Sequence, residues 1–90
     1  MLYMVIEQYK TPGAIDVYRR AKNQGRMLPE GLNYVSSWVD VDFTRCFQLM
    51  ETDDVRLFAR WIDHWKDLVE FQIVPVQTSA EAIQTIAPRL

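Results

Sequence analysis

The chain has little of the chemistry from which catalytic and metal sites are usually built. Of its 90 residues, one is a cysteine, Cys46, and one is a histidine, His64. An internal disulfide is therefore excluded, and one chain cannot supply the usual Cys and His ligands of zinc. The three glycines form no phosphate-binding loop, and one histidine gives no spacing that marks a catalytic triad. We expect no metal and no cofactor.

Long apolar runs and an excess of one charge are also missing. No stretch approaches the roughly 18 apolar residues of a transmembrane helix, and Glu7 interrupts the N-terminal segment before it could form a signal peptide. Ten basic and twelve acidic side chains leave a formal charge of −2, so the chain has no strong positive field to hold a nucleic acid by its phosphates. We therefore expect a cytoplasmic protein that binds neither membrane nor nucleic acid.

What the chain does have is apolar material for one core. Its residues are 49% hydrophobic, 12% aromatic and 24% charged, which is typical of a globular protein. Because a chain of this length buries only roughly 60% of its unfolded surface, it builds a single core. We predict one domain over residues 1–90.

Hydrophobic periodicity and turn residues divide the chain into strands and helices. Strands rich in β-branched, aromatic and apolar residues are predicted at 2–9, 32–39, 44–51 and 69–76. A first helix is predicted to start at Thr11 and Pro12 and to stop at Gly25, a second to run from Thr52 to Leu68, and a short C-terminal helix to begin at Thr78 with a capping box. The order β-α-β-β-α-β plus a terminal helix predicts an α+β, ferredoxin-like sandwich with a four-stranded antiparallel sheet and both long helices on one face.

The two middle strands are predicted to form a hairpin without a polar face. With a turn centred on residues 41–42, Trp38 lies opposite Arg45. One face then carries Tyr34, Ser36, Trp38, Arg45, Phe47 and Leu49, and the other carries Val35, Ser37, Val39, Thr44, Cys46, Gln48 and Met50. Because the helices cover only one face, we expect a homodimer through the sheet face left open.

The chain resembles an uncharacterised family of small bacterial proteins of unknown function. The resemblance is carried by segments 34–40 and 45–51, the helix with Trp61 and Trp65, and residues 74–76. That family is similar to the dimeric α+β barrel superfamily, in which two ferredoxin-like protomers join their sheets and enclose a cavity. Other branches include cofactor-free monooxygenases of polyketide-like substrates, haem-degrading enzymes and plant stress-responsive proteins. The resemblance implies a dimeric α+β barrel but carries over no reaction and no catalytic residue.

Four side chains are candidates for ligand binding. Arg45 can stack on Trp38 or offer its guanidinium to an anionic ligand. Ser37 and Gln48 belong to the mixed face, where a few polar groups among apolar ones are typical of a ligand pocket. Period-two alternation shows which residues share a face but not which face meets the helices.

The other reactive side chains are expected to be structural. His64 is predicted on a helix flank away from the cavity, and Cys46 is predicted to be buried as a small apolar group. Glu7 and Glu51 are strand carboxylates that are solvated, bound to an arginine, or paired for acid–base chemistry. The catalytic residues, if there are any, stay unassigned.

Two classes of function follow. The first is a homodimer that acts as a non-catalytic module, binding a small apolar molecule or a protein. The alternative is a cofactor-free, monooxygenase-like enzyme that acts on a small apolar or aromatic substrate in the barrel cavity. The sequence leaves open whether the protein is an enzyme.

Overall fold

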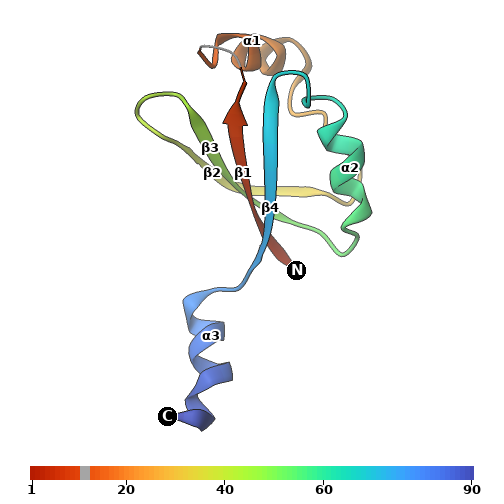
Figure 1. The fold of residues 1–90 in the computed structure, drawn as a ribbon. Helices are drawn as coiled ribbons and strands as arrows, with labels where there is room; N and C mark the ends of the chain where they lie inside the picture. The colour runs from red at the N-terminus through yellow and green to blue at the C-terminus, as the bar shows by residue number, and fades with distance from the viewer. Residues whose placement is uncertain (11–12) are drawn as a thin grey trace.

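A computed structural model describes residues 1–10 and 13–90, and it contains one four-stranded sheet (Figure 1). The strands are β1 (Leu2–Tyr9), β2 (Asn33–Val39), β3 (Arg45–Glu51) and β4 (Val69–Val76). The helices are α1 (Ile15–Gln24), α2 (Arg56–Ile62) and α3 (Ser79–Ile86), followed by a 3₁₀ turn at Ala87–Arg89. All neighbouring strands are antiparallel, in the order β2-β3-β1-β4. The predicted α+β fold and its βαββαβ order are confirmed.

The core lies between the helices and one face of the sheet. Its buried members are Tyr3, Val5, Leu32, Met50, Phe58, Trp61 and Trp65. Alternate residues of β1 and β3 point to this side, so period-two alternation places Val5 and Met50 against the aromatic side chains of α2. Burying a side chain of this size stabilises the fold by about 2 kcal/mol. These contacts fix the helices over the sheet.

The helix boundaries match the prediction only in part. Gly25 ends α1 with a φ of 68°, as predicted, whereas the predicted cap at Thr11 and Pro12 lies outside the described residues. The capping box that begins α3 is confirmed: the Thr78 hydroxyl accepts a bond from the Glu81 backbone N–H, and the Glu81 carboxylate accepts one from the Thr78 N–H.

The second helix is shorter than predicted at both ends. The Thr52 hydroxyl donates to the Gly31 carbonyl, 2.8 Å away, instead of capping the helix. Beyond Ile62 the chain continues as turns in which His64 N–H and Trp65 N–H bond to carbonyls three residues back. Trp65 stays buried beside Trp61 in spite of the tighter turns, so the apolar pattern of the sequence did not reveal the change.

The hairpin register also differs from the prediction. Trp38 lies opposite Phe47 and not opposite Arg45. The Asp40 carboxylate accepts bonds from the backbone N–H groups of Thr44 (2.8 Å) and Arg45 (3.2 Å), and Phe43 has a φ of 57°. Together they build a longer turn and shift the register by two residues, which leaves most residues on the predicted face.

A register shift between Tyr34 and Ser36 moves one residue to the other face. Tyr34 pairs with Met50 and so joins the side of the sheet that faces the helices. This irregularity has no signal in the alternation of β2.

The second face of the sheet has no covering layer in the described part of the chain. Its centre is apolar: Met4, Ile6, Phe47, Leu49 and Val74 lie there, and Trp38 at its edge is 55% exposed. Helix α3 projects away from the body of the molecule (Figure 1). Its apolar side chains Ile83 and Ile86 are exposed.

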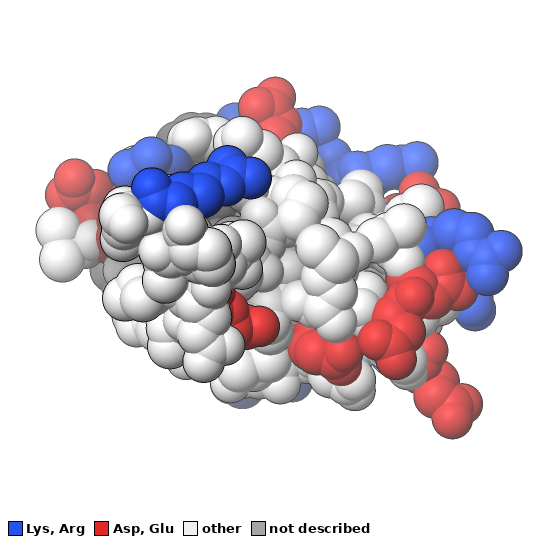
Figure 2. Space-filling model, turned by 90° about the horizontal axis from the view of Figure 1, so that it is seen from below, with Lys and Arg blue, Asp and Glu red and all other residues white. Residues whose placement is uncertain are grey.

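In one view of the surface, most charged groups lie near the outline of the molecule (Figure 2). Seen from the end that carries α3, uncharged side chains fill the centre of the surface, with Lys, Arg, Asp and Glu around them (Figure 2). None of the helices formed by residues 1–10 and 13–90 is both long enough and apolar enough to cross a bilayer.

Candidate functional site

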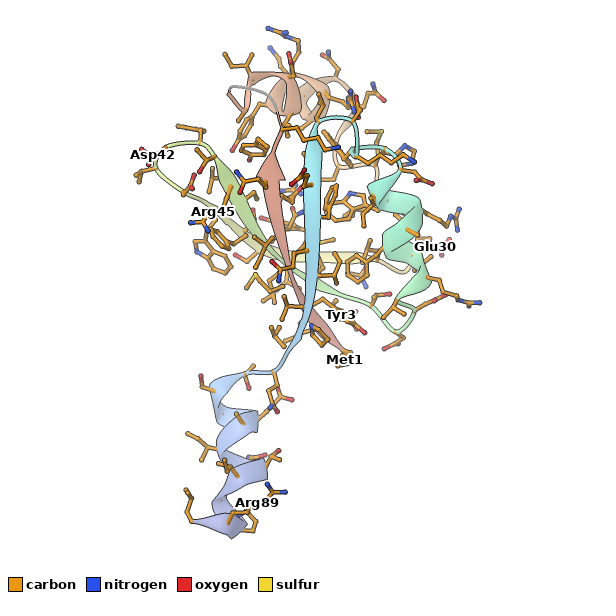
Figure 3. All side chains as sticks on the ribbon, in the orientation of Figure 1. Met1, Tyr3, Glu30, Asp42, Arg45 and Arg89 are labelled. Carbon is orange, nitrogen blue, oxygen red and sulfur yellow. The ribbon has the colours of Figure 1, made fainter. Side chains whose placement is uncertain are left out.

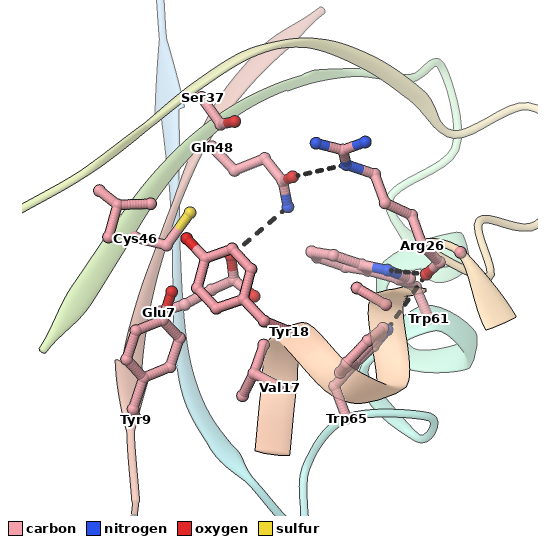
Figure 4. A pocket seen from close by; sticks show the side chains of 13 residues that line it. Glu7, Tyr9, Val17, Tyr18, Arg26, Ser37, Cys46, Gln48, Trp61 and Trp65 are labelled. Carbon is pink, nitrogen blue, oxygen red and sulfur yellow. Dashed lines mark hydrogen bonds between the residues drawn. The ribbon is translucent and has the colours of Figure 1, made fainter. Parts of the chain in front are cut away.

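A cavity of about 240 Å³ lies between the sheet and the helices (Figure 4). Its lining comes from three strands, from α1, from α2 and from the segment after each helix: Glu7, Tyr9, Val17, Tyr18, Ala21, Gly25, Arg26, Ser37, Val39, Cys46, Gln48, Trp61 and Trp65. A closed cavity of about 150 Å³ can hold benzene, so this one has room for a substituted single ring. A mostly apolar wall with a few polar groups is the usual composition of a ligand site.

Glu7 is the acidic group of this cavity. It sits in the central strand β1 opposite Cys46 and is 8% exposed. Burial raises the pKa of its carboxyl from 4.5 to about 7, although a hydrogen bond with Cys46 and the charge of Arg26 act in the opposite direction. The Gln48 side-chain amide lies 3.5 Å from its Oε2. A carboxyl that titrates near neutral pH and lines a cavity is typical of functional sites.

Cys46 and Tyr9 beside Glu7 are held in their neutral forms. Burial raises the pKa of the Cys46 thiol to about 12, with a further contribution from Glu7. Burial also raises the pKa of the Tyr9 hydroxyl, and the neighbouring side chains of Cys46, Tyr18 and Glu7 add to the shift. The thiol is therefore a weak hydrogen-bond donor and not a nucleophile. The predicted burial of Cys46 is confirmed.

Arg26 is the basic group of the cavity and follows the glycine that ends α1. Its Nε donates to Gln48 Oε1 at 3.2 Å, and its guanidinium carbon lies 3.8 Å from the centre of the Tyr34 ring. Figure 4 shows the Gln48 amide extending between Arg26 and Glu7. One glutamine side chain thus links the acidic and basic groups.

Comparison with known proteins places the whole chain in one family. Residues 1–90 match the family described as Domain of unknown function (DUF3303). The chain belongs to this family. No curated protein was found to match it. Since the description of DUF3303 states no activity, the function has to be argued from the cavity.

In this DUF3303 chain, the four predicted ligand-binding residues lie on two different faces. Ser37 and Gln48 line the cavity. Trp38 and Arg45 belong to the open face of the sheet, and Figure 3 shows Arg45 on the side of the hairpin away from α2. Arg45 pairs with Asp40 at 3.6 Å, so the expected pairing with Trp38 is wrong.

The remaining candidates of the DUF3303 chain lie outside the cavity. His64 is exposed in the turn after α2, where its carbonyl accepts a bond from Arg20. Glu51 accepts bonds from the N-terminal amine and from Asn33 on the other face of the sheet, so it does not pair with Glu7. No group of three or more potential metal ligands occurs among residues 1–10 and 13–90.

Two charged residues of the cavity wall, Glu7 and Arg26, were not among the ligand-binding candidates predicted from the sequence. Glu7 was treated as a carboxylate at a strand end, and only the packing of α1 and α2 over β1 makes it buried. Arg26 follows a helix-ending glycine, and no local pattern in the sequence marks it. Its position depends on the distant Trp61 and Trp65, whose indole N–H groups both donate to the Arg26 carbonyl.

Proposed function

We propose that this DUF3303 protein binds a small, partly apolar molecule in the cavity between its sheet and helices. The observation that carries the proposal is Glu7. A buried carboxyl costs stability unless something compensates for it, and an apolar side chain would fill the same space without that cost. A carboxyl kept at the wall of a cavity is well placed to bind a ligand.

The open volume of the cavity also favours ligand binding over a purely structural role. Protein interiors are close-packed, and voids larger than a water molecule are few. This pocket of about 240 Å³ is instead partly open to solvent, since Tyr18 and Arg26 in its wall are exposed, and a concave, largely apolar pocket is the usual form of a ligand site. The open volume therefore favours the ligand-binding half of the first hypothesis.

A cavity-filling variant tests this proposal. Thermal unfolding is measured with a library of single-ring aromatic and alicyclic compounds, because a ligand of the folded state raises the melting temperature. Ala21→Leu introduces bulk into the lining of the cavity and should abolish the shifts. Ala59→Leu makes the same change at an exposed position of α2 and should leave them intact. Equal shifts in both variants, or none in the wild type, would exclude binding in this cavity.

A second candidate is cofactor-free oxidation of such a molecule by O₂, favoured by the pKa of about 7 at Glu7. The Glu7 carboxylate would take a proton from an activated CH₂ group. The electron pair left behind reduces O₂, one oxygen atom forms a C=O bond, and the other leaves as water with the two hydrogens. Oxygen uptake with a single-ring substrate that carries an activated CH₂ group, such as phenylacetone, would support it if the uptake is lost in Glu7→Gln. Uptake that persists in Glu7→Gln, or no uptake, would refute it.

We further propose that the protein is a homodimer, assembled through the open sheet face as an α+β barrel. Support comes from the apolar centre of that face, and from Arg45 and Glu70, which flank Gln8 at one end of it. A surface that carries both an apolar patch and charges of opposite sign can be complementary to its own copy. Light scattering should give twice the 10.6 kDa of one chain, and a mass of one chain at micromolar concentration would overturn the dimer.

A further inference from the structure

The backbone of Arg26 is held by two buried tryptophans. The Arg26 carbonyl accepts hydrogen bonds from the indole N–H groups of Trp61 (3.0 Å) and Trp65 (3.1 Å), which are 2% and 5% exposed. Gly25 and Met27 on either side both have positive φ angles, 68° and 58°. A methionine in this region is strained, so the surrounding contacts must fix the path of the chain.

The side chain of Arg26 is oriented just as firmly. Its guanidinium packs on the Tyr34 ring at 3.8 Å, and its Nε bonds to Gln48 at 3.2 Å. Stacking and the single Nε bond leave the outer edge of the guanidinium, with four of its five N–H donors, available. Among residues 1–10 and 13–90, nothing accepts a hydrogen bond from these four donors.

Four of the seven arginines are paired with an aspartate, whereas Arg26, Arg60 and Arg89 form no salt bridge within the described part of the chain, and of these three only Arg26 lines the cavity. Arg19, Arg20, Arg45 and Arg56 each form a salt bridge with an aspartate. Arg26 has no carboxylate within 4.0 Å in the described part of the chain, and its link to Glu7 passes through Gln48. A positioned guanidinium at a cavity, with its donors unused, is prepared for an anion from outside.

We propose that Arg26 binds the carboxylate of a small organic acid whose apolar body occupies the cavity. The inference rests on the proposed ligand-binding function and names the class of ligand. A guanidinium and a carboxylate match in two parallel hydrogen bonds. Val17, Ala21 and Val39 offer an apolar wall to the body of the ligand.

The size and polarity of the cavity further restrict the class of ligand. A volume of about 240 Å³ has room for one substituted ring. Glu7 lies at the other end of the Gln48 link from Arg26, and a monoanion leaves less negative charge beside it than a phosphate dianion. A monocyclic carboxylic acid with a polar substituent that reaches Glu7 fits both ends.

Matched acid and amide probes test the assignment. Benzoate, phenylacetate and 4-hydroxybenzoate are titrated into the full chain by calorimetry, together with their neutral amides and with phenyl phosphate. The acids should bind at least tenfold more tightly than the amides. Arg26→Gln should remove this preference, and Arg26→Lys should restore it only in part, because lysine lacks the planar fork.

Arg60→Gln is the matched control, since Arg60 is exposed on α2 and does not line the cavity. It should keep wild-type affinities, and an unchanged melting temperature of Arg26→Gln shows that its fold is intact. Amides that bind as well as acids would overturn the role of Arg26 while leaving the proposed function standing. If phenyl phosphate bound more tightly than the acids, the group that Arg26 binds would be a phosphate and not a carboxylate. If no probe bound, both proposals would be contradicted.

Discussion

The stability of the fold should depend on the protonation of Glu7. The pKa of this carboxyl is about 7 in the folded protein and close to 4.5 when the chain is unfolded. The folded state therefore holds the proton more tightly, and the associated stability is complete below pH 4.5 and is lost as the pH rises through 7. Since one pKa unit corresponds to about 1.36 kcal/mol, the change between pH 4 and pH 8 is about 3 kcal/mol.

Glu7→Gln isolates this effect, because glutamine has the same shape and never ionises. The free energy of unfolding is measured for both proteins by urea denaturation at pH 4, 6 and 8 and at one protein concentration. The wild type should lose about 3 kcal/mol relative to Glu7→Gln over this range. All other groups titrate alike in both proteins, so their effects cancel in the difference.

Glu51→Gln serves as a control, because ionisation of Glu51 should change the stability in the opposite direction to ionisation of Glu7. Hydrogen bonds from Asn33 and the N-terminal amine lower the pKa of the exposed Glu51 carboxyl. Its stabilising effect is therefore present above pH 4.5 and lost as the pH falls. If the stability of Glu7→Gln and that of the wild type changed in parallel from pH 4 to pH 8, Glu7 would not be the buried, near-neutral group described here.

Four other predictions concern single contacts. Trp61→Phe should cost about 1 to 2 kcal/mol of unfolding free energy, because it removes a buried hydrogen bond to Arg26, and calorimetry should show weaker benzoate binding. Leu49→Asp on the open face should yield monomers by light scattering, whereas Val55→Asp, at an exposed apolar site outside the sheet, should not. Alkylation of Cys46 by iodoacetamide at pH 8, followed by mass spectrometry, should be roughly a thousandfold slower in the folded than in the unfolded chain, because little thiolate forms. Benzoate binding at pH 7 should take up a fraction of a proton, measured by calorimetry in buffers of different ionisation enthalpy, and proton release would contradict the link between Arg26 and Glu7.

The elements of this fold could be predicted because their signals are local. Alternation of apolar residues marked each strand to within a residue, and Gly25 and the Thr78 capping box marked helix ends. The hairpin register could not be predicted, because it depends on the Asp40 side chain, which bonds to the backbone of Thr44 and Arg45 and lengthens the turn. This contact is local, but the same alternation of apolar residues is compatible with either turn length, so the strand pattern does not choose between them.

The site could be predicted only in part, for a different reason. Ser37 and Gln48 were chosen as a possible lining of the barrel cavity between two sheets, whereas the structure places them on the face that meets the helices, where they line a different cavity. Alternation gave Trp38 and Arg45 equal standing, because a strand pattern does not state which side the helices cover. Only the packed helices make that distinction.

The pKa of Glu7 and the charge at Arg26 are coupled through the cavity. The positive charge of Arg26 lowers the pKa of Glu7, and the other groups close to this carboxyl, the Gln48 amide and the Cys46 thiol, are neutral. A carboxylate bound to the guanidinium cancels that charge, so the pKa of Glu7 must rise and the folded protein must take up protons near pH 7. By the same linkage, the protonated form of Glu7 binds the acid more tightly than the ionised form. If the protein binds a small organic acid as proposed, its affinity should therefore increase as the pH falls from 8 to 6 and Glu7 takes up its proton, which a calorimetric titration at both pH values would measure.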